Sequence, residues 1–166
     1  MSHVEEKITS DVPAEVVMSL AEQKAVDVAK EMPEGTVILG SDTVVAADGK
    51  ILGKPKSHEE AYEMIRRLAG RSHQVYTGVC LVKKGPEGEA DTVVSFYDET
   101  DVNVSPMTEK EIREYADSEE PMDKAGSYAV QGFFARYIDG LKGSYANVMG
   151  LPVHLVYQEL KKLGAL

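Results

Sequence analysis

The sequence predicts an α/β fold in which helices pack on a mixed, twisted β-sheet. Three observations lead to this prediction. Apolar residues recur at every third or fourth position in several stretches, which is typical of amphipathic helices. Other stretches are rich in β-branched and aromatic residues and alternate in polarity, which is typical of strands. Short turns join these strands in pairs, so hairpins recur and a purely parallel sheet is excluded.

Length and charge narrow the class of protein further. The 166 residues fit a single domain that spans 1–166. The formal net charge of −10 at pH 7 excludes the basic surface that a nucleic-acid polymer requires. It does not exclude a nucleotide, because a few lysines and a divalent cation can hold phosphates within an acidic protein.

Cysteine usage and hydropathy predict a cytoplasmic protein. The single cysteine, Cys80, lies in an apolar run, so we expect a buried thiol and no disulfide framework within the chain. No apolar run approaches the roughly eighteen residues that a membrane-spanning helix needs. We therefore expect a reducing compartment and no membrane partner.

The first predicted helix begins at Pro13, a residue that suits the first helical turn, with Ser10 or Asp11 as its cap. A Met-Pro-Glu-Gly break at 32–35 ends it. Lys24 falls on or beside the apolar stripe of this helix. Its ammonium group either extends along the apolar surface to solvent or reaches a functional site.

The stretch 37–55, VILGSDTVVAADGKILGKP, carries the strongest functional signal. It predicts a strand with Asp42 inside it, an Asp-Gly turn, and a returning segment that ends at Lys54. We expect Asp42 and Lys54 to face one cleft, where the carboxylate holds a cation or a water and the ammonium holds a phosphate. The alternative is that Asp42 caps a turn while Lys54 is solvated. The apolar flanks favour a functional role, because a buried carboxylate costs free energy unless it is paired.

The rest of the chain alternates helices with extended segments. Ser57 and Thr108 are the expected N-caps of two helices, each with a glutamate three residues later. The irregular loop at 120–132 is long for a compact domain, and such loops are usually functional. The other predicted elements, in chain order, are a helix from Ser57 to Gly70, strands at 73–82 and 91–104, a helix after Thr108, a short strand near 133–138 and a final helix from Pro152.

Four segments, in the same order, resemble the Maf family of septum-formation-inhibitor-like proteins. They are GSDTVVAADGKILGKP at 40–55, LAGRSHQVYTGV at 68–79, EPMDKAGSYAVQG at 120–132 and GSYANVMGLPV at 143–153. The resemblance extends from about Val4 to the end of the chain. It implies an α/β fold like those of Maf proteins and inosine triphosphate pyrophosphatases.

The resemblance implies an enzyme that hydrolyses a nucleoside triphosphate to the monophosphate and diphosphate with a divalent cation, Mg²⁺ or Mn²⁺. The motifs are most similar to the branch that acts on dTTP and UTP, with modified pyrimidine nucleotides as further substrates. Asp42 matches the proton acceptor, and Lys24 and Lys54 match phosphate-facing lysines. Glu6, with Glu5 as the alternative, matches an acid near the metal, so Glu6 and Asp42 are the implied metal ligands.

The same resemblance assigns the residues that recognise the substrate. Thr43 and Gln131 match the positions where the base is selected, and Asp123 and Lys124 match a motif at the rim of the site. The amide of Gln131 offers a donor and an acceptor, as the imide edge of a pyrimidine requires. Without the resemblance, a glutamine here would first be interpreted as stabilising its own loop. A homodimer is also implied.

One feature of the family has no counterpart in the printed sequence. The family begins with a strand, a Ser-x-Ser-Pro-Arg-Arg phosphate loop and a helix, whereas the first arginine of this chain is Arg66. We therefore expect the fold to lack the family's first strand and helix. We also expect the pyrophosphatase activity of this chain to be weakened or lost.

Two other functions stay open at this point. An inosine-triphosphate-type pyrophosphatase shares the architecture, but Gln131 and the Asp-Lys-Ala-Gly segment argue against a purine substrate. A non-catalytic nucleotide-binding or division-regulating protein belongs to a different class. The missing arginine loop supports this second alternative.

Overall fold

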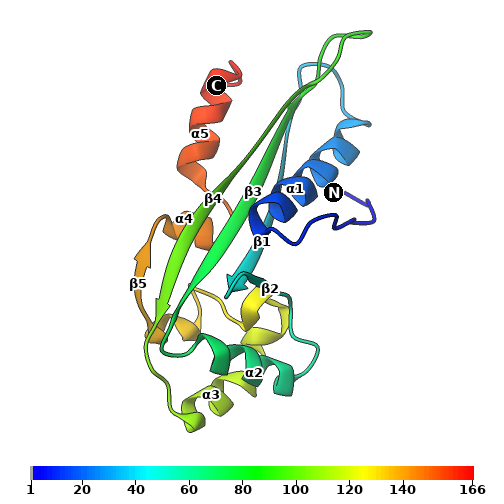
Figure 1. Cartoon of the computed structure of the whole chain (residues 1–166). Helices are drawn as coiled ribbons and strands as arrows, with labels where there is room; N and C mark the ends of the chain where they lie inside the picture. The colour runs from blue at the N-terminus through cyan, green and yellow to red at the C-terminus, as the bar shows by residue number, and fades with distance from the viewer. Residues whose placement is uncertain (1) are drawn as a thin grey trace.

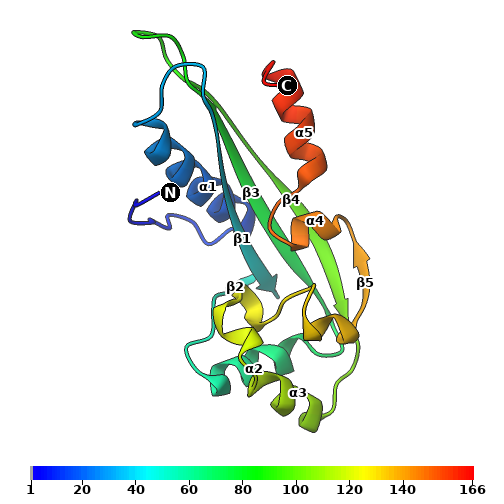
Figure 2. The ribbon, with the colours of Figure 1, turned by 180° about the vertical axis from the view of Figure 1, so that it is seen from behind.

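Figure 1 shows the computed structural model of the protein, which describes residues 2–166. Five strands form one sheet in the order β2-β1-β3-β4-β5. Helix α1 covers one face of the long strands, while α4 and α5 lie against the other face, as the two opposite views show (Figures 1 and 2). The predicted α/β fold is confirmed.

The elements follow the predicted order closely. The strands are β1 (Val37–Ala47), β2 (Lys50–Leu52), β3 (Ser72–Lys83), β4 (Thr92–Val104) and β5 (Ile138–Lys142). The α-helices are α1 (Pro13–Ala29), α2 (His58–Leu68), α3 (Glu109–Ala116), α4 (Tyr145–Val148) and α5 (Val153–Lys162). Short 3-10 helices form at η1 (Glu120–Asp123), η2 (Ala125–Ser127) and η3 (Phe133–Tyr137).

The expectation of a mixed sheet needs correction, because all four strand pairings of the described residues are antiparallel. Two hairpins join β1 to β2 and β3 to β4. The connection through β2 and α2 returns the chain to the end of the sheet at which β1 finishes (Figure 1), so β3 runs back along β1. A parallel pair would instead need a crossover that re-enters the sheet at the opposite end.

Two glycines bring α1 unusually close to the sheet. A Cβ atom on Gly40 of β1 would lie 2.3 Å from the carbonyl oxygen of Ala21, and one on Gly78 of β3 would lie 2.3 Å from that of Val17. Any larger residue at either position would therefore push the helix away from the strands. This close approach determines how near the side chains of α1 come to those of β1.

The local start and stop signals were mostly predicted correctly. Thr108 forms the complete capping box with Glu111, and the hydroxyl of Ser57 accepts a hydrogen bond from the backbone of Glu60. The cap of α1 was wrong, since Val12 occupies that position without a side-chain bond. The Ser10 hydroxyl instead donates to Glu15 and accepts from the backbone of Val12.

The strand predicted near 133–138 begins only at Ile138. Residues 133–137 form η3, because the carboxylate of Glu120 accepts the backbone N–H groups of Phe133 and Phe134 and holds them in a turn. The ring of Phe134 is completely buried between Tyr115 and Tyr128. The apolar run therefore reflects one buried ring rather than an extended backbone.

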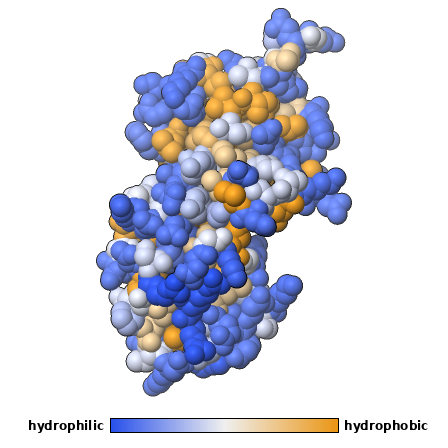
Figure 3. All heavy atoms as spheres, viewed as in Figure 1, coloured by the Kyte–Doolittle hydropathy of each residue, from blue (hydrophilic) through white to orange (hydrophobic). Residues whose placement is uncertain are grey.

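The surface is uneven in polarity. Figure 3 shows mostly hydrophilic residues over the lower lobe, which holds α2 and α3, and apolar patches over the upper half. Cys80 is fully buried, as predicted. Within residues 2–166, the helices are too short or too polar for any of them to cross a bilayer.

Candidate functional site

Neighbouring side chains of β1 point to opposite faces of the sheet, and this alternation divides the predicted site residues into two groups. Asp42 points toward α1, because it lies opposite Gly78, whose missing side chain accommodates Val17 of the helix. Thr43 points to the other face, where it lies opposite Thr77. We call these two sides the α1 face and the loop face of β1.

Three of the predicted residues meet on the α1 face. The ammonium nitrogen of Lys24 lies 2.5 Å from Oδ1 of Asp42 and 3.1 Å from Oε1 of Glu6. The Asp42 side chain is only 16% exposed, while that of Glu6 is 46% exposed. The one-residue alternative, Glu5, is exposed and forms none of these contacts. The structure thus brings together one largely buried carboxylate, one lysine and one accessible carboxylate.

The environment of Asp42 strengthens it as a base. Burial raises the pKa of Asp42, the nearby charge of Glu6 raises it further, and Lys24 and Lys54 only partly oppose this. Burial by itself would lower the pKa of Lys24, but its hydrogen bonds and charge interactions with Asp42 and Glu6 outweigh burial and raise it. Lys24 therefore remains an ammonium ion beside a carboxylate with elevated proton affinity.

The metal ligands implied by the resemblance are compatible with one particular binding mode. Within residues 2–166, no group of three or more His, Cys, Asp or Glu side chains is arranged to hold a metal ion unaided. Glu6 and Asp42 flank the same lysine, however, and Mg²⁺ commonly binds one or two carboxylates together with substrate phosphates and waters. The donor set therefore fits a cation that arrives with a phosphorylated substrate.

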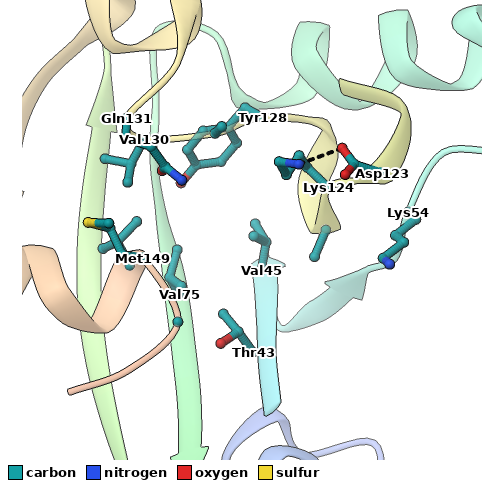
Figure 4. Close-up of a pocket in the computed structure, with 14 residues that line it drawn as sticks. Thr43, Val45, Lys54, Val75, Asp123, Lys124, Tyr128, Val130, Gln131 and Met149 are labelled. Atoms are coloured by element: carbon teal, nitrogen blue, oxygen red, sulfur yellow. Dashed lines mark hydrogen bonds and ion pairs between the residues drawn. The ribbon is translucent and has the colours of Figure 1, made fainter. Parts of the chain in front are cut away.

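A pocket of about 230 Å³ occupies the loop face (Figure 4). Its floor comes from β1 and β3, and the segments at 123–131 and 148–150 form its walls. The labelled side chains of Val75, Val130 and Met149 lie toward one side of the view, and Asp123, Lys124 and Lys54 lie toward the other. The lining comprises Thr43, Val45, Lys54, Val75, Asp123, Lys124, Ala125, Tyr128, Ala129, Val130, Gln131, Val148, Met149 and Gly150.

The irregular loop is held over this pocket by specific contacts. Gly126 has a positive φ of 68° and packs against Val45, where an added Cβ would lie 2.7 Å from the valine side chain. Its backbone N–H donates to the carbonyl of Gly53 at 3.0 Å. The hydroxyl of Tyr128 lies 2.7 Å from Nε2 of buried His73. These contacts place Gln131 at the pocket, with its side chain exposed to a ligand.

Lys54 lies between the two faces. It lines the loop-face pocket, and its charge also opposes the raised pKa of Asp42 on the α1 face. Lys124 differs, because its ammonium forms a 2.5 Å ion pair with Asp123 and holds the pKa of that carboxyl below its ordinary value. The expectation that Asp42 and Lys54 face one cleft is therefore too simple, since the lysine lines the loop-face pocket while Asp42 points to the α1 face.

The two faces meet across an open edge of β1. Within the described residues, β2 pairs with β1 only from Val45 onward, so residues 37–44 have a strand partner on one side alone. A second cavity of about 450 Å³ lies beside this edge, and Glu6, Lys24 and Ser41 are among the residues that line it. A ligand that crosses the edge can contact Thr43 and Lys54 at one end and Lys24 and Glu6 at the other.

Sequence reasoning missed several residues of this site. Tyr128, Val75 and Met149 line the pocket, and buried Thr77 supports Thr43 from β3. A polar residue at an inward position between Val75 and Val79 was the available signal for Thr77. Outside the site, His58 joins two helices, since its Nδ1 lies 2.7 Å from the carbonyl oxygen of Ala116.

Comparison with known proteins identifies the family of this chain. The model of the family described as Maf-like protein matches residues 1–163. A protein of Lachnoclostridium phytofermentans named dTTP/UTP pyrophosphatase is 46% identical over 164 residues, which are 99% of this chain and 83% of that protein.

Two further relatives carry the same name. The protein of Carboxydothermus hydrogenoformans is 47% identical over 161 residues, or 97% of this chain and 84% of the relative. The protein of Agathobacter rectalis is 47% identical over 175 residues, with 96% of this chain and 83% of the relative covered. The similarity thus includes both faces of β1 and the loops around the pocket.

Proposed function

The chain belongs to the Maf-like family, and from this premise we propose that it is a nucleoside triphosphate pyrophosphatase acting on dTTP and UTP. The observation that carries the proposal is the arrangement around β1. A largely buried carboxylate with a raised pKa lies on one face, a base-sized pocket lies on the other, and a lysine lies between them. A nucleotide that crosses the open edge would place its base and its phosphates on different faces.

The loop face suits a pyrimidine. Apolar side chains of Val75, Val130 and Met149 offer surfaces for a planar ring, and hydrophobic lining with a few polar groups is typical of ligand pockets. Thr43 and Gln131 are the polar groups that would meet the edge of the base. Modified pyrimidine nucleotides would enter the same pocket.

The α1 face suits the hydrolytic step. Asp42 would accept a proton from water as that water attacks the α-phosphorus, and the bond between the α- and β-phosphates would break to release diphosphate. Lys24 and Lys54 would stabilise the negative charge that develops on the phosphate oxygens. A divalent cation held by Glu6 and Asp42 would neutralise phosphate charge when bound. Lys124, already paired with Asp123, would act at the rim.

A substrate panel tests the proposal. The chain would be incubated with dTTP, UTP, CTP, GTP and ITP in the presence of Mg²⁺ or Mn²⁺, and released diphosphate would be measured. We expect weak hydrolysis of dTTP and UTP that still exceeds hydrolysis of the others, and loss of hydrolysis with a chelator that is reversed by added cation. Diphosphate release from ITP alone would contradict the pyrimidine assignment and favour a purine pyrophosphatase.

A non-catalytic nucleotide-binding protein is the second candidate. The ion pair between Lys24 and Asp42 favours it, because this contact occupies the proposed base in the absence of substrate. It predicts that UTP binds without turnover and that Asp42→Asn leaves this binding unchanged. Calorimetry together with the diphosphate assay separates the two functions.

Two expectations about the assembled protein belong to the same proposal. We expect a homodimer, with exposed apolar side chains such as Tyr157 and Val153 of α5 available to a second copy. Light scattering after gel filtration would measure its mass. We also expect the enzyme to work in the cytoplasm, where nucleoside triphosphates are formed, and fractionation with an antibody would locate it.

A further inference from the structure

A cross-strand pair of hydroxyl groups lies directly below the pocket. Oγ1 of Thr43 in β1 and Oγ1 of Thr77 in β3 are 2.9 Å apart, and the two residues are register partners in the sheet. Thr77 is completely buried, so solvent does not compete for its hydroxyl. Either oxygen could donate in this contact if it were considered by itself.

A third group decides the direction of the hydrogen bond. The Thr77 hydroxyl also lies 2.9 Å from the backbone carbonyl oxygen of Asn147, which can only accept. A hydroxyl carries one hydrogen, so Thr77 donates it to this carbonyl. The same hydroxyl must then accept from Thr43, since two oxygens facing each other through lone pairs would repel. The chain of donors therefore runs from Thr43 through Thr77 to Asn147.

The end of this chain is held in place by buried contacts. The side-chain nitrogen of Asn147 donates to the carbonyl of Val75 at 3.1 Å and to the hydroxyl of Thr100 at 2.9 Å. The backbone carbonyl of Asn147, which accepts from Thr77, also accepts the backbone N–H of Gly150 at 2.9 Å, so both of its lone pairs are used. Asn147 is completely buried. Its side-chain nitrogen must be the atom that faces the Val75 carbonyl, because that carbonyl can only accept a hydrogen bond.

We propose that Thr77 and Asn147 are positioning residues that make Thr43 a hydrogen-bond acceptor toward the base. This inference rests on the proposed function and names its selectivity. Thr43 has given its only hydrogen to Thr77, so the group of the base that it meets must be a donor. The N3–H of uracil and thymine meets this requirement, whereas the bare N3 of cytosine would place one lone pair against another.

Gln131 completes the selection on the same edge. Its amide nitrogen can donate to a ring carbonyl next to N3–H. Uracil and thymine have a carbonyl on each side of N3–H, whereas cytosine has an amino group in place of one of them. An acceptor next to a donor in the protein thus matches the donor and acceptor of uracil and thymine. The hydroxyl chain below Thr43 keeps that pattern from reversing.

The test replaces Thr77 by valine, which has nearly the same shape but no hydroxyl. Thr43 would then be free to turn its hydrogen toward the base and donate to N3 of cytosine. We expect the ratio of kcat/KM for UTP to that for CTP to fall about tenfold, the effect of one hydrogen bond. Thr77→Ser keeps the donor and should retain the wild-type ratio. Equal losses for UTP and CTP in T77V would overturn the inference and indicate a purely structural role.

A binding measurement separates this inference from the proposed function. Calorimetry with UMP and CMP reports selectivity without any turnover, in both the wild-type chain and T77V. If the wild type prefers UMP and the variant does not, the inference stands even where no triphosphate is hydrolysed. If UTP is hydrolysed but the preference for UMP survives in T77V, the inference fails and the function stands. Absence of any preference in the wild type also overturns the inference.

The valine variant must fold for these outcomes to count. Circular dichroism and a melting curve would establish this, because T77V leaves the Thr43 hydroxyl and the backbone carbonyl of Asn147 with one partner fewer. If T77V does not fold, Thr77→Cys takes its place, since a thiol is a weak donor of similar size. It should then reduce the UTP preference relative to Thr77→Ser, and an unchanged ratio would overturn the inference.

Discussion

The two faces of β1 differ in how they satisfy their polar groups. On the α1 face, charged side chains pair with one another, with Lys24 between Asp42 and Glu6. On the loop face, neutral hydroxyl and backbone groups form a directed chain from Thr43 into the core. The α1 face is therefore suited to moving a proton and stabilising charge, and the loop face is suited to recognising a neutral base.

This difference has a physical basis in one strand. Adjacent residues of β1 are forced to opposite sides by the pleat, so Asp42 and Thr43 perform different tasks although they are neighbours in sequence. The open edge at 37–44 lets one substrate reach both faces. Perturbing one face at a time should then separate turnover from recognition.

The largest effect should come from Asp42→Asn on the α1 face. Removing the proposed base should lower kcat for UTP by about 10² to 10⁴, because general base catalysis contributes that much. UMP binding, measured by calorimetry, should stay within about twofold if the faces are separate. Asp48→Asn is the matched control. This exposed carboxylate lies in the β1–β2 turn, away from the proposed chemistry, and pairs with Arg71. Equal losses in both variants would contradict the comparison.

The stability of the protein at acidic pH should show whether the loop face requires a neutral His73. Burial lowers the pKa of His73 from 6.5 to about 4. The imidazole ring is therefore protonated less readily in the folded protein than in the unfolded chain. Because the unfolded state binds the extra proton, this contribution to stability is present above pH 6.5 and is lost as the pH falls toward 4. The loss amounts to about 3 kcal/mol.

Urea unfolding at several pH values would measure this effect in His73→Gln. The free energy of unfolding of the variant should depend less on pH between 7 and 4 than that of the wild type. His154→Gln, at an exposed position of α5, is the control and should retain the wild-type dependence. Identical pH dependence in wild type and His73→Gln would show that the buried histidine does not resist protonation.

Lys54 offers a test of the link between the two faces. Lys54→Gln should lower kcat/KM for UTP by roughly ten- to a hundredfold, since its charge reaches both the pocket and Asp42. Lys124→Gln should cost less, because Asp123 already neutralises that lysine. Lys50→Gln, exposed on β2, serves as the control. A larger loss for Lys124 than for Lys54 would place the phosphates at the rim instead.

The smallest effect should be a shift in the pH profile of Lys24→Met. The wild-type lysine opposes the effect of burial on Asp42, so its removal should raise the pKa of that carboxyl further. Activity needs the deprotonated base, and the acidic limb of kcat/KM should therefore move to higher pH. Lys30→Met, near the end of α1, should leave the limb unmoved. A limb that moves to lower pH would refute the role assigned to the ion pair.

Local chemistry let the sequence predict much of this protein. The Asp-Gly turn with positive φ at Asp48 and Gly49, the caps at Ser57 and Thr108, and the long hairpin of β3 and β4 follow from preferences of a few neighbouring residues. Two of the errors arose where distant groups intervened. Glu120 bends Phe133 and Phe134 into a turn, and β2 with α2 reverses the chain before β3.

The sequence by itself determined which chemical groups are available and that Asp42 and Thr43 stand next to each other on a strand. Only the tertiary structure decided what each of them contacts. The glycines at 40 and 78 bring Lys24 to Asp42, and the short helix α4, which carries Asn147, sets the direction of the Thr43 hydroxyl. These partners lie far from β1 in sequence, and strand alternation, close packing and hydrogen-bond geometry determine which of them each side chain meets.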